Sequence, residues 1–70
     1  MATELQEGDR IYWESEGVRV YGQIKNIFEH KITRKIDGVE VARVGSAEDP
    51  ALFIIQEDGA RALKLASEVH

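Results

Sequence analysis

The sequence has no cysteine, one proline and few aromatic residues, and these shortages exclude several classes of protein. Without cysteine there is no disulfide framework, no thiolate zinc site and no cysteine nucleophile. A chain of 70 residues is also short. A domain of this size buries only about 60% of the surface of its unfolded chain, so we expect one thin core and no deep enzymatic cleft.

Long hydrophobic runs are missing too. The longest apolar run, residues 51–55, is far shorter than the ~20 residues that a membrane-spanning helix requires. Residues 1–8 are polar and acidic, unlike the basic start and apolar centre of a signal peptide. We therefore expect a cytoplasmic protein that has no membrane partner.

The composition is that of an ordinary globular domain. Apolar residues make up 43% of the chain and charged residues 31%. Nine basic residues against thirteen acidic ones give a formal net charge of −4, which favours basic partners by electrostatic steering. We expect a single domain over residues 1–70, with residues 1–7 flexible.

Short alternating segments predict strands. In residues 10–14, Ile11 and Trp13 lie on one side of the predicted strand and Tyr12 lies on the other. A turn at residues 15–17 separates this segment from a second alternating one. No segment of convincing length has the period of a helix.

Glycines mark the bends and turns between these strands. Gly22 inside the second strand, with a change of apolar phase after it, predicts a bend or bulge near residues 25–26. Asp37-Gly38 and Asp58-Gly59 each predict a tight hairpin turn. We therefore expect an all-β protein with about five antiparallel strands in a small barrel, because closure removes exposed edges. A short turn at residues 66–69 is expected to end the chain.

Four motifs follow one another in a recognisable order along the chain from Leu5 onwards. They are GDRIYW at residues 8–13, the second strand with its Gly22, AEDPAL at 47–52 with Ile54 and Asp58-Gly59 after it, and the closing Leu63-Lys64 and Ser67-Glu68-Val69. Their order and spacing resemble the Tudor-like domain family named for hypervirulence-associated protein. The resemblance implies an SH3-like, Tudor-type barrel and a binding role. Leu52 stands where that family commonly has Tyr, so one potential ligand-facing ring is missing.

Residues suited to catalysis or metal binding are scarce. All three serines lie in turn-like contexts, and one of the two histidines is the last residue given. Glu29 and His30 are adjacent, so in a strand they point to opposite faces and cannot chelate one ion together. The acidic pairs at 48–49 and 57–58 lack the alternating oxygen ligands of a calcium loop. We expect a non-catalytic protein with no catalytic residues, no cofactor and no metal.

Three aromatic residues, Tyr12, Tyr21 and Phe53, are the candidates for binding a partner. Alternation places the two tyrosines on the face opposite Trp13, as cross-strand neighbours. One interpretation is a cage of rings that attracts a cation such as a methylated lysine. The other is that the tyrosines cover a sheet face, and it is favoured because a cage normally needs three or more rings. The leading functional hypothesis is an interaction module that binds a protein or peptide on its outer sheet face.

A basic middle segment supplies the alternative hypothesis. Residues 18–43 contain six basic and three acidic side chains, a net charge of +3. Contact with nucleic-acid phosphates would use Lys25, Lys31, Arg34, Lys35 and Arg43. The acidic remainder of the chain repels a long polyanion, so a mixed, solvated surface is the favoured interpretation.

Residues 52–55 are apolar on both faces of their predicted strand. Such a strand needs cover on its outer side, either from the terminal segment 66–69 or from another protein. We favour partial cover by the terminal segment. The remaining hypothesis is a homo-oligomer built on Phe53 and Ile55, so the chain is expected to be a monomer or a weak homo-oligomer.

Overall fold

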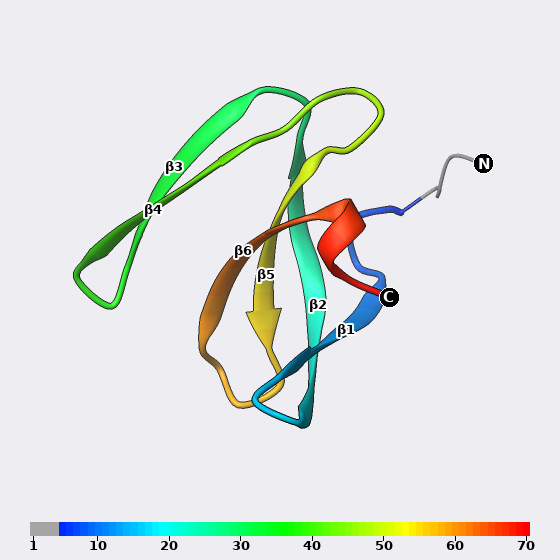
Figure 1. Cartoon of the computed structure of the whole chain (residues 1–70), viewed down its shortest axis with the longest axis vertical. Coiled ribbons are helices and arrows are strands. Elements are labelled where there is room, and N and C mark those ends of the chain that lie inside the picture. The colour runs from blue at the N-terminus through cyan, green and yellow to red at the C-terminus, as the bar shows by residue number, and fades with distance from the viewer. Residues whose placement is uncertain (1–4) are drawn as a thin grey trace.

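The computed structural model describes residues 5–70, which form six strands and one short helical turn (Figure 1). The all-β prediction is confirmed, with six strands in place of about five. In chain order the elements are β1 (Arg10–Ser15), β2 (Val18–Phe28), β3 (Lys31–Ile36), β4 (Val39–Val44), β5 (Ala51–Gln56), β6 (Arg61–Leu65) and the 3₁₀ turn η1 (Ala66–Glu68).

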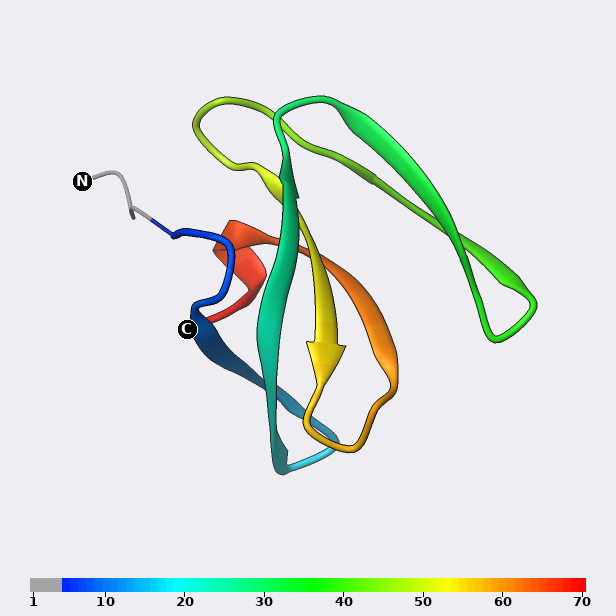
Figure 2. The same ribbon diagram turned by 180° about the vertical axis from the view of Figure 1, so that it is seen from behind.

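The strands form two antiparallel sheets. One has four strands in the order β1-β2-β5-β6, and the other is the β3–β4 hairpin. Figures 1 and 2 show the four-stranded sheet curling into a half-barrel, with the hairpin leaning away from it on the side of β6. The free edge of β1 is partly paired by the end of the chain. The His70 amide donates to the Tyr12 carbonyl over 2.7 Å, and the Tyr12 amide donates to the His70 carbonyl over 3.1 Å.

Two of the three hairpin turns have the same backbone conformation. Glu16 and Gly17 have φ of 53° and 78°, and Asp37 and Gly38 have φ of 51° and 79°, as a type I′ turn requires. Asp58-Gly59 also lies in a hairpin turn, between β5 and β6, as predicted, but the turn is of another type because only Gly59 has positive φ there. The Gly59 amide donates to the Gln56 carbonyl over 2.8 Å, so this loop has three residues and ends in a bulge.

The core lies inside the curl of the four-stranded sheet. Trp13 is only 6% exposed there, so its predicted place in the interior is confirmed. It belongs to a buried cluster contributed by β1, β2, β5 and the chain terminus: Ile11, Trp13, Ile24, Leu52, Ile54 and Val69. The Nζ atom of Lys64 lies 5.4 Å from the Trp13 ring centroid, on the open side of the curl.

The β3–β4 hairpin lies against the outer side of the sheet at β6 and at Phe53 of β5. Phe53 and its register partner Leu63 share that side, and Leu63 is 2% exposed. The Arg34 guanidinium of β3 lies 5.9 Å from the Phe53 ring. The prediction that the terminal segment 66–69 covers this side is wrong, because Val69 packs with Leu52 and the rest of the core on the inner side.

β2 bends where the sequence predicts it. The register between β2 and β5 shifts between Ile24 and Asn26, which confirms the predicted bulge. Gly22 is buried where β2 pairs with β5, opposite Gln56. A Cβ atom built on it would lie 2.6 Å from Cγ2 of Ile54 and 3.0 Å from the carbonyl oxygen of Ile55. Gly22 therefore allows β2 and β5 to approach closely.

The expectation of a flexible segment at residues 1–7 falls partly outside the described residues. Within them, Leu5 packs against the core and the Gly8 amide donates to the Ile24 carbonyl over 2.7 Å. The only helical element from residue 5 onwards is η1, which is too short to cross a bilayer.

The close approach at Gly22 predicts the effect of adding one methyl group. We expect Gly22→Ala to lower the free energy of unfolding by about 1–3 kcal/mol, because the packed Ile54 side chain and the β5 backbone must move. Urea denaturation followed by Trp13 fluorescence measures the change. Lys25→Ala, an exposed change on the same strand, is the control and should stay within about 0.5 kcal/mol of the wild type. An equally small effect of Gly22→Ala would contradict the close packing of Ile54 and the β5 backbone against Gly22.

Candidate functional site

The outer face of the β1–β2 hairpin gathers aromatic and arginine side chains. The tight turn sets the register, with Tyr12 opposite Tyr21, and alternation then places both tyrosines on the side away from Trp13. Their expected position as cross-strand neighbours is confirmed. We call this surface the Arg/Tyr face; its strand residues are Arg10, Tyr12, Glu14, Arg19, Tyr21 and Gln23.

The rings of this face touch one another. The Tyr12 and Tyr21 ring centroids are 5.4 Å apart, with the ring planes tilted by 45°. The His70 ring stacks beside Tyr12 at 5.2 Å and 28°, because the two backbone bonds to Tyr12 bring the end of the chain there. The ring contacts and the paired backbones limit the freedom of both tyrosines.

An arginine guanidinium from the neighbouring strand lies over each tyrosine ring. Arg10 lies over Tyr21 at 4.1 Å from the ring centroid, and Arg19 lies over Tyr12 at 4.2 Å. These are diagonal pairs, since Arg10 stands opposite Gln23 in the register and Arg19 stands opposite Glu14. Diagonal neighbours are within reach of long side chains on a twisted sheet. Cation–π attraction thus favours the position of both guanidinium groups over the rings.

Two glutamates complete the electrostatics of the face. Arg10 Nε donates to Glu57 Oε2 over 2.6 Å, whereas Arg19 Nη2 is 3.8 Å from Glu14 Oε2. The hydrogen bond from Arg10 lowers the pKa of Glu57 and raises the pKa of Arg10. The pKa of Arg19 is also raised, first by its polar contact with the Tyr21 side chain and then by Tyr12. Both arginines are well exposed, at 62% and 49% of their side chains, so water screens these pairs.

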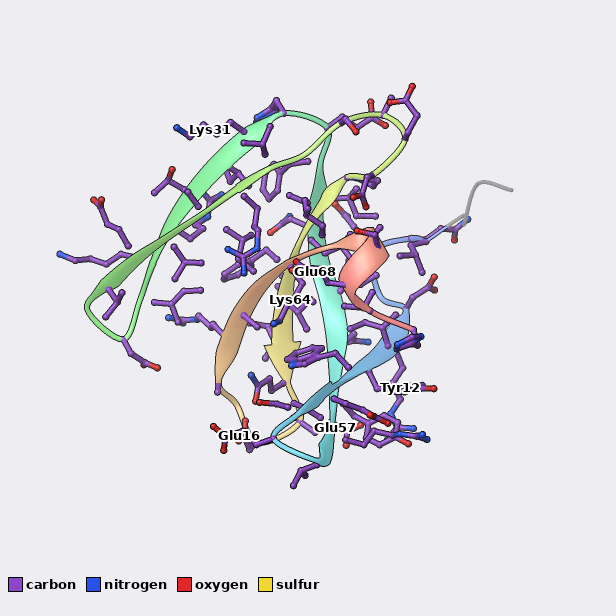
Figure 3. All side chains as sticks on the ribbon, viewed as in Figure 1. Tyr12, Glu16, Lys31, Glu57, Lys64 and Glu68 are labelled. Carbon is purple, nitrogen blue, oxygen red and sulfur yellow. The ribbon has the colours of Figure 1, made fainter. Side chains whose placement is uncertain are left out.

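Two shallow hollows flank this face where β2 meets β5. One, of about 310 Å³, is lined by Arg10, Gly22, Gln23, Ile55, Gln56 and Glu57. The other, of about 280 Å³, is lined by Arg19, Val20, Tyr21, Gln56, Glu57 and Asp58. Figure 3 shows Tyr12 and Glu57 at the same end of the molecule, with Lys31 at the opposite end. The Arg/Tyr face therefore continues from β1 and β2 onto the end of β5.

Phe53 does not join the two tyrosines. The Glu57 amide donates to the Tyr21 carbonyl, and Phe53 stands four residues earlier in the chain, about 13 Å away along an extended strand. Phe53 is half-buried beneath Arg34. The hypothesis of one surface made of Tyr12, Tyr21 and Phe53 is thus corrected to a surface with two rings. Ile55, which the oligomer hypothesis named together with Phe53, lines the larger of the two hollows.

The five basic residues of the nucleic-acid hypothesis do not share one surface. On β3, Lys31 and Lys35 are exposed, while Arg34 alternates to the half-buried side and lies over Phe28 and Phe53. Arg43 is half-buried on β4, and its Nε lies 3.3 Å from Glu68 Oε1. Lys25 is on β2, at the bulge. Nucleic-acid contact stays a prediction.

Residues of the kinds that catalyse or bind metals have structural partners. Ser67 donates from its amide to Asp49 Oδ1 and from its hydroxyl to Asp49 Oδ2, each over 2.8 Å, which ties the loop before β5 to η1. In the described part of the chain no three side chains of the His, Cys, Asp or Glu type are grouped to hold a metal ion. The chemistry available at the Arg/Tyr face is ion pairing, hydrogen bonding and ring stacking.

Sequence reasoning missed most of the charged residues of the face. For Arg10, Glu14 and Arg19 a signal was present, because the register of a two-residue turn places them beside the tyrosines. For Glu57 and His70 there was none. They reach the site through the pairing of β2 with β5 and through the return of the chain terminus to β1.

Comparison with known proteins confirms the resemblance seen in the motifs. The family model described as "Hypervirulence associated proteins TUDOR domain" matches residues 8–69, nearly the whole chain. No curated protein and no solved structure matches the chain.

The Arg10–Glu57 pair predicts a measurable titration. In the wild type the Glu57 carboxyl should titrate below its ordinary pKa of 4.5, and in Arg10→Gln it should return to that value. Because the folded state lowers this pKa, the pair favours folding above the ordinary carboxyl range and stops doing so as the pH falls through the lowered value. NMR of the side-chain carboxyl carbons measures both titrations. Lys35→Gln is the control and should leave Glu57 unchanged. The same titration in wild type and Arg10→Gln would contradict the pair.

Proposed function

This chain belongs to the family of hypervirulence-associated protein TUDOR domains, and from that membership we propose that it is a non-catalytic interaction module. Tudor-like domains often mediate interactions. The proposed binding surface is the Arg/Tyr face, and the proposed partner is a protein or a peptide.

One observation carries the proposal: two neighbouring tyrosine rings are held on an accessible sheet face with an arginine over each of them. Tyrosine and arginine are enriched among the residues that dominate binding energy at protein interfaces. Rings already ordered by stacking lose little further freedom on binding, so more of the contact energy remains as affinity.

The charged groups of the face also suit binding better than catalysis. The groups whose pKa is shifted, Arg10, Arg19 and Glu57, are paired with each other or with the tyrosines and are open to water. A general acid or base typically has its pKa shifted toward the working pH by burial or by a like charge. Here the shifts stabilise the charged forms, as they do in ion pairs on a recognition surface.

Site-specific photo-crosslinking in an extract of the native cells tests this proposal. A photoreactive amino acid replaces Gln23, an exposed residue on the Arg/Tyr face, or Thr33, an exposed residue on the β3–β4 hairpin. We expect discrete protein adducts from position 23 and few from position 33. Adding Tyr12→Ser or Tyr21→Ser should reduce the adducts about tenfold or more, as for a hot-spot residue.

The variants must first be shown to be folded, by their amide NMR spectra. Equal adducts from both positions, or adducts from position 23 that survive both tyrosine changes, would contradict docking on the Arg/Tyr face. Nuclease-sensitive adducts from position 33 alone would favour the nucleic-acid hypothesis instead.

A further inference from the structure

The tyrosine rings of the Arg/Tyr face are already in contact with this chain's own cations. Arg10 lies over Tyr21 and Arg19 lies over Tyr12, both close enough for cation–π attraction. A basic group from a partner would have to displace a guanidinium, and it would meet the repulsion of the second one nearby. The local arrangement therefore disfavours the basic partner that the net charge of the chain suggests.

The same stacking prepares both arginines for anions. A guanidinium has five N–H donors in one plane, in a fork that matches a carboxylate. Both arginine side chains are well exposed over their rings, at 62% and 49%, so a ligand can reach these donors from solvent. Arg10 uses Nε to bind Glu57, whereas Arg19 has a polar contact with the Tyr21 side chain and lies 3.8 Å from Glu14, which is longer than a hydrogen bond. Donors on both side chains remain for an incoming acceptor.

Glu57 shows which chemistry this site accepts. Its carboxylate binds Arg10 over 2.6 Å, although its side chain is 57% exposed and free to turn into water. Glu14, the register partner of Arg19, places a second carboxylate 3.8 Å from that guanidinium. Both contacts are screened by solvent, so each is weak enough for another carboxylate to replace it.

The hollows indicate the shape of the ligand. They share Gln56 and Glu57, with Arg10 in one and with Arg19 and Tyr21 in the other. The first hollow also has an apolar wall from Ile55. An extended peptide that places side chains on one face at every second residue has the form to reach both hollows.

We infer that the partner docks on the Arg/Tyr face through an extended acidic segment, whose carboxylates bind Arg10 and Arg19 in place of Glu57 and Glu14. This inference rests on the proposed function and gives the chemistry of its ligand. Glu57 and Glu14 then act as internal competitors, which hold the arginines in place when no partner is bound and lower the partner's apparent affinity.

Labelled peptides test the inference directly. The probe is a nine-residue fluorescein-labelled peptide of alternating Glu and Thr, and the comparison peptides carry Gln or Lys at the Glu positions. Fluorescence anisotropy at low salt measures binding to the whole chain, and the Nε–H resonances of Arg10 and Arg19 report its location. We expect the Glu peptide alone to bind, to shift both arginine resonances, and to bind more weakly as salt increases.

Variants separate a specific site from general charge attraction. Arg10→Gln should weaken binding of the Glu peptide about tenfold, the effect of losing a charge-assisted hydrogen bond. Glu57→Gln should strengthen binding severalfold, because a neutral amide competes less strongly for Arg10, which still lies over the Tyr21 ring. The matched controls are Lys35→Gln and Glu48→Gln, which change the net charge by the same amounts at exposed positions outside the Arg/Tyr face. Both should stay within about twofold of the wild type, since the exposed charges there are screened.

Several results would overturn the inference. They are Gln or Lys peptides that bind as tightly as the Glu peptide, a Glu57→Gln variant that binds no better than Glu48→Gln, and no peptide binding at millimolar concentration. A dimer in sedimentation that Arg10→Gln dissociates would also overturn it, because a second copy would then be the occupant. If crosslinking from position 23 still captures a partner, the proposed function survives and only the acidic ligand fails. If that capture fails as well, both fail.

Discussion

Trp13 lies in the core with 6% of its surface exposed. Its burial fixes which side of β1 faces outward and therefore where the Arg/Tyr face lies. Side chains alternate along a strand, so with the indole inside, Arg10 and Tyr12 must lie outside. A slip of one residue in the β1–β2 register would exchange the inward-facing and outward-facing side chains of a strand. The turn at Glu16-Gly17 prevents that slip, because its backbone conformation closes the hairpin with Ser15 opposite Val18.

The long strand β2 connects the Arg/Tyr face to the rest of the sheet. β2 has 11 residues and pairs with β1 along one edge and with β5 along the other. Gly22 pairs with Gln56, and the Glu57 amide donates to the Tyr21 carbonyl, which brings the end of β5 beside Tyr21. That approach places Glu57 within reach of Arg10 and creates the two hollows. The pairing of β2 with β5 thus links the packing of the sheet to the chemistry of the outer face.

Net charge and local charge lead to different partners here. A formal charge of −4 attracts cations at long range, but such attraction is largely screened beyond about 8 Å at physiological ionic strength. At contact the partner meets Arg10 and Arg19, fixed on their rings. The proposed acidic segment follows from the groups at contact distance, because short contacts are screened less than the field of the whole chain.

The sequence alone determined the all-β fold, the inward side of Trp13, the Tyr12–Tyr21 pair, the bulge after Ile24 and the family. Each follows from neighbours in the chain, through strand alternation, turn residues or the order of motifs. Only the tertiary structure decided that Phe53 lies under Arg34, that the basic residues of β3 divide between two faces, that Glu57 binds Arg10, and that His70 stacks on Tyr12. These are contacts between segments distant in the sequence, and they depend on how the sheet curls and where the hairpin folds back, which local patterns do not specify.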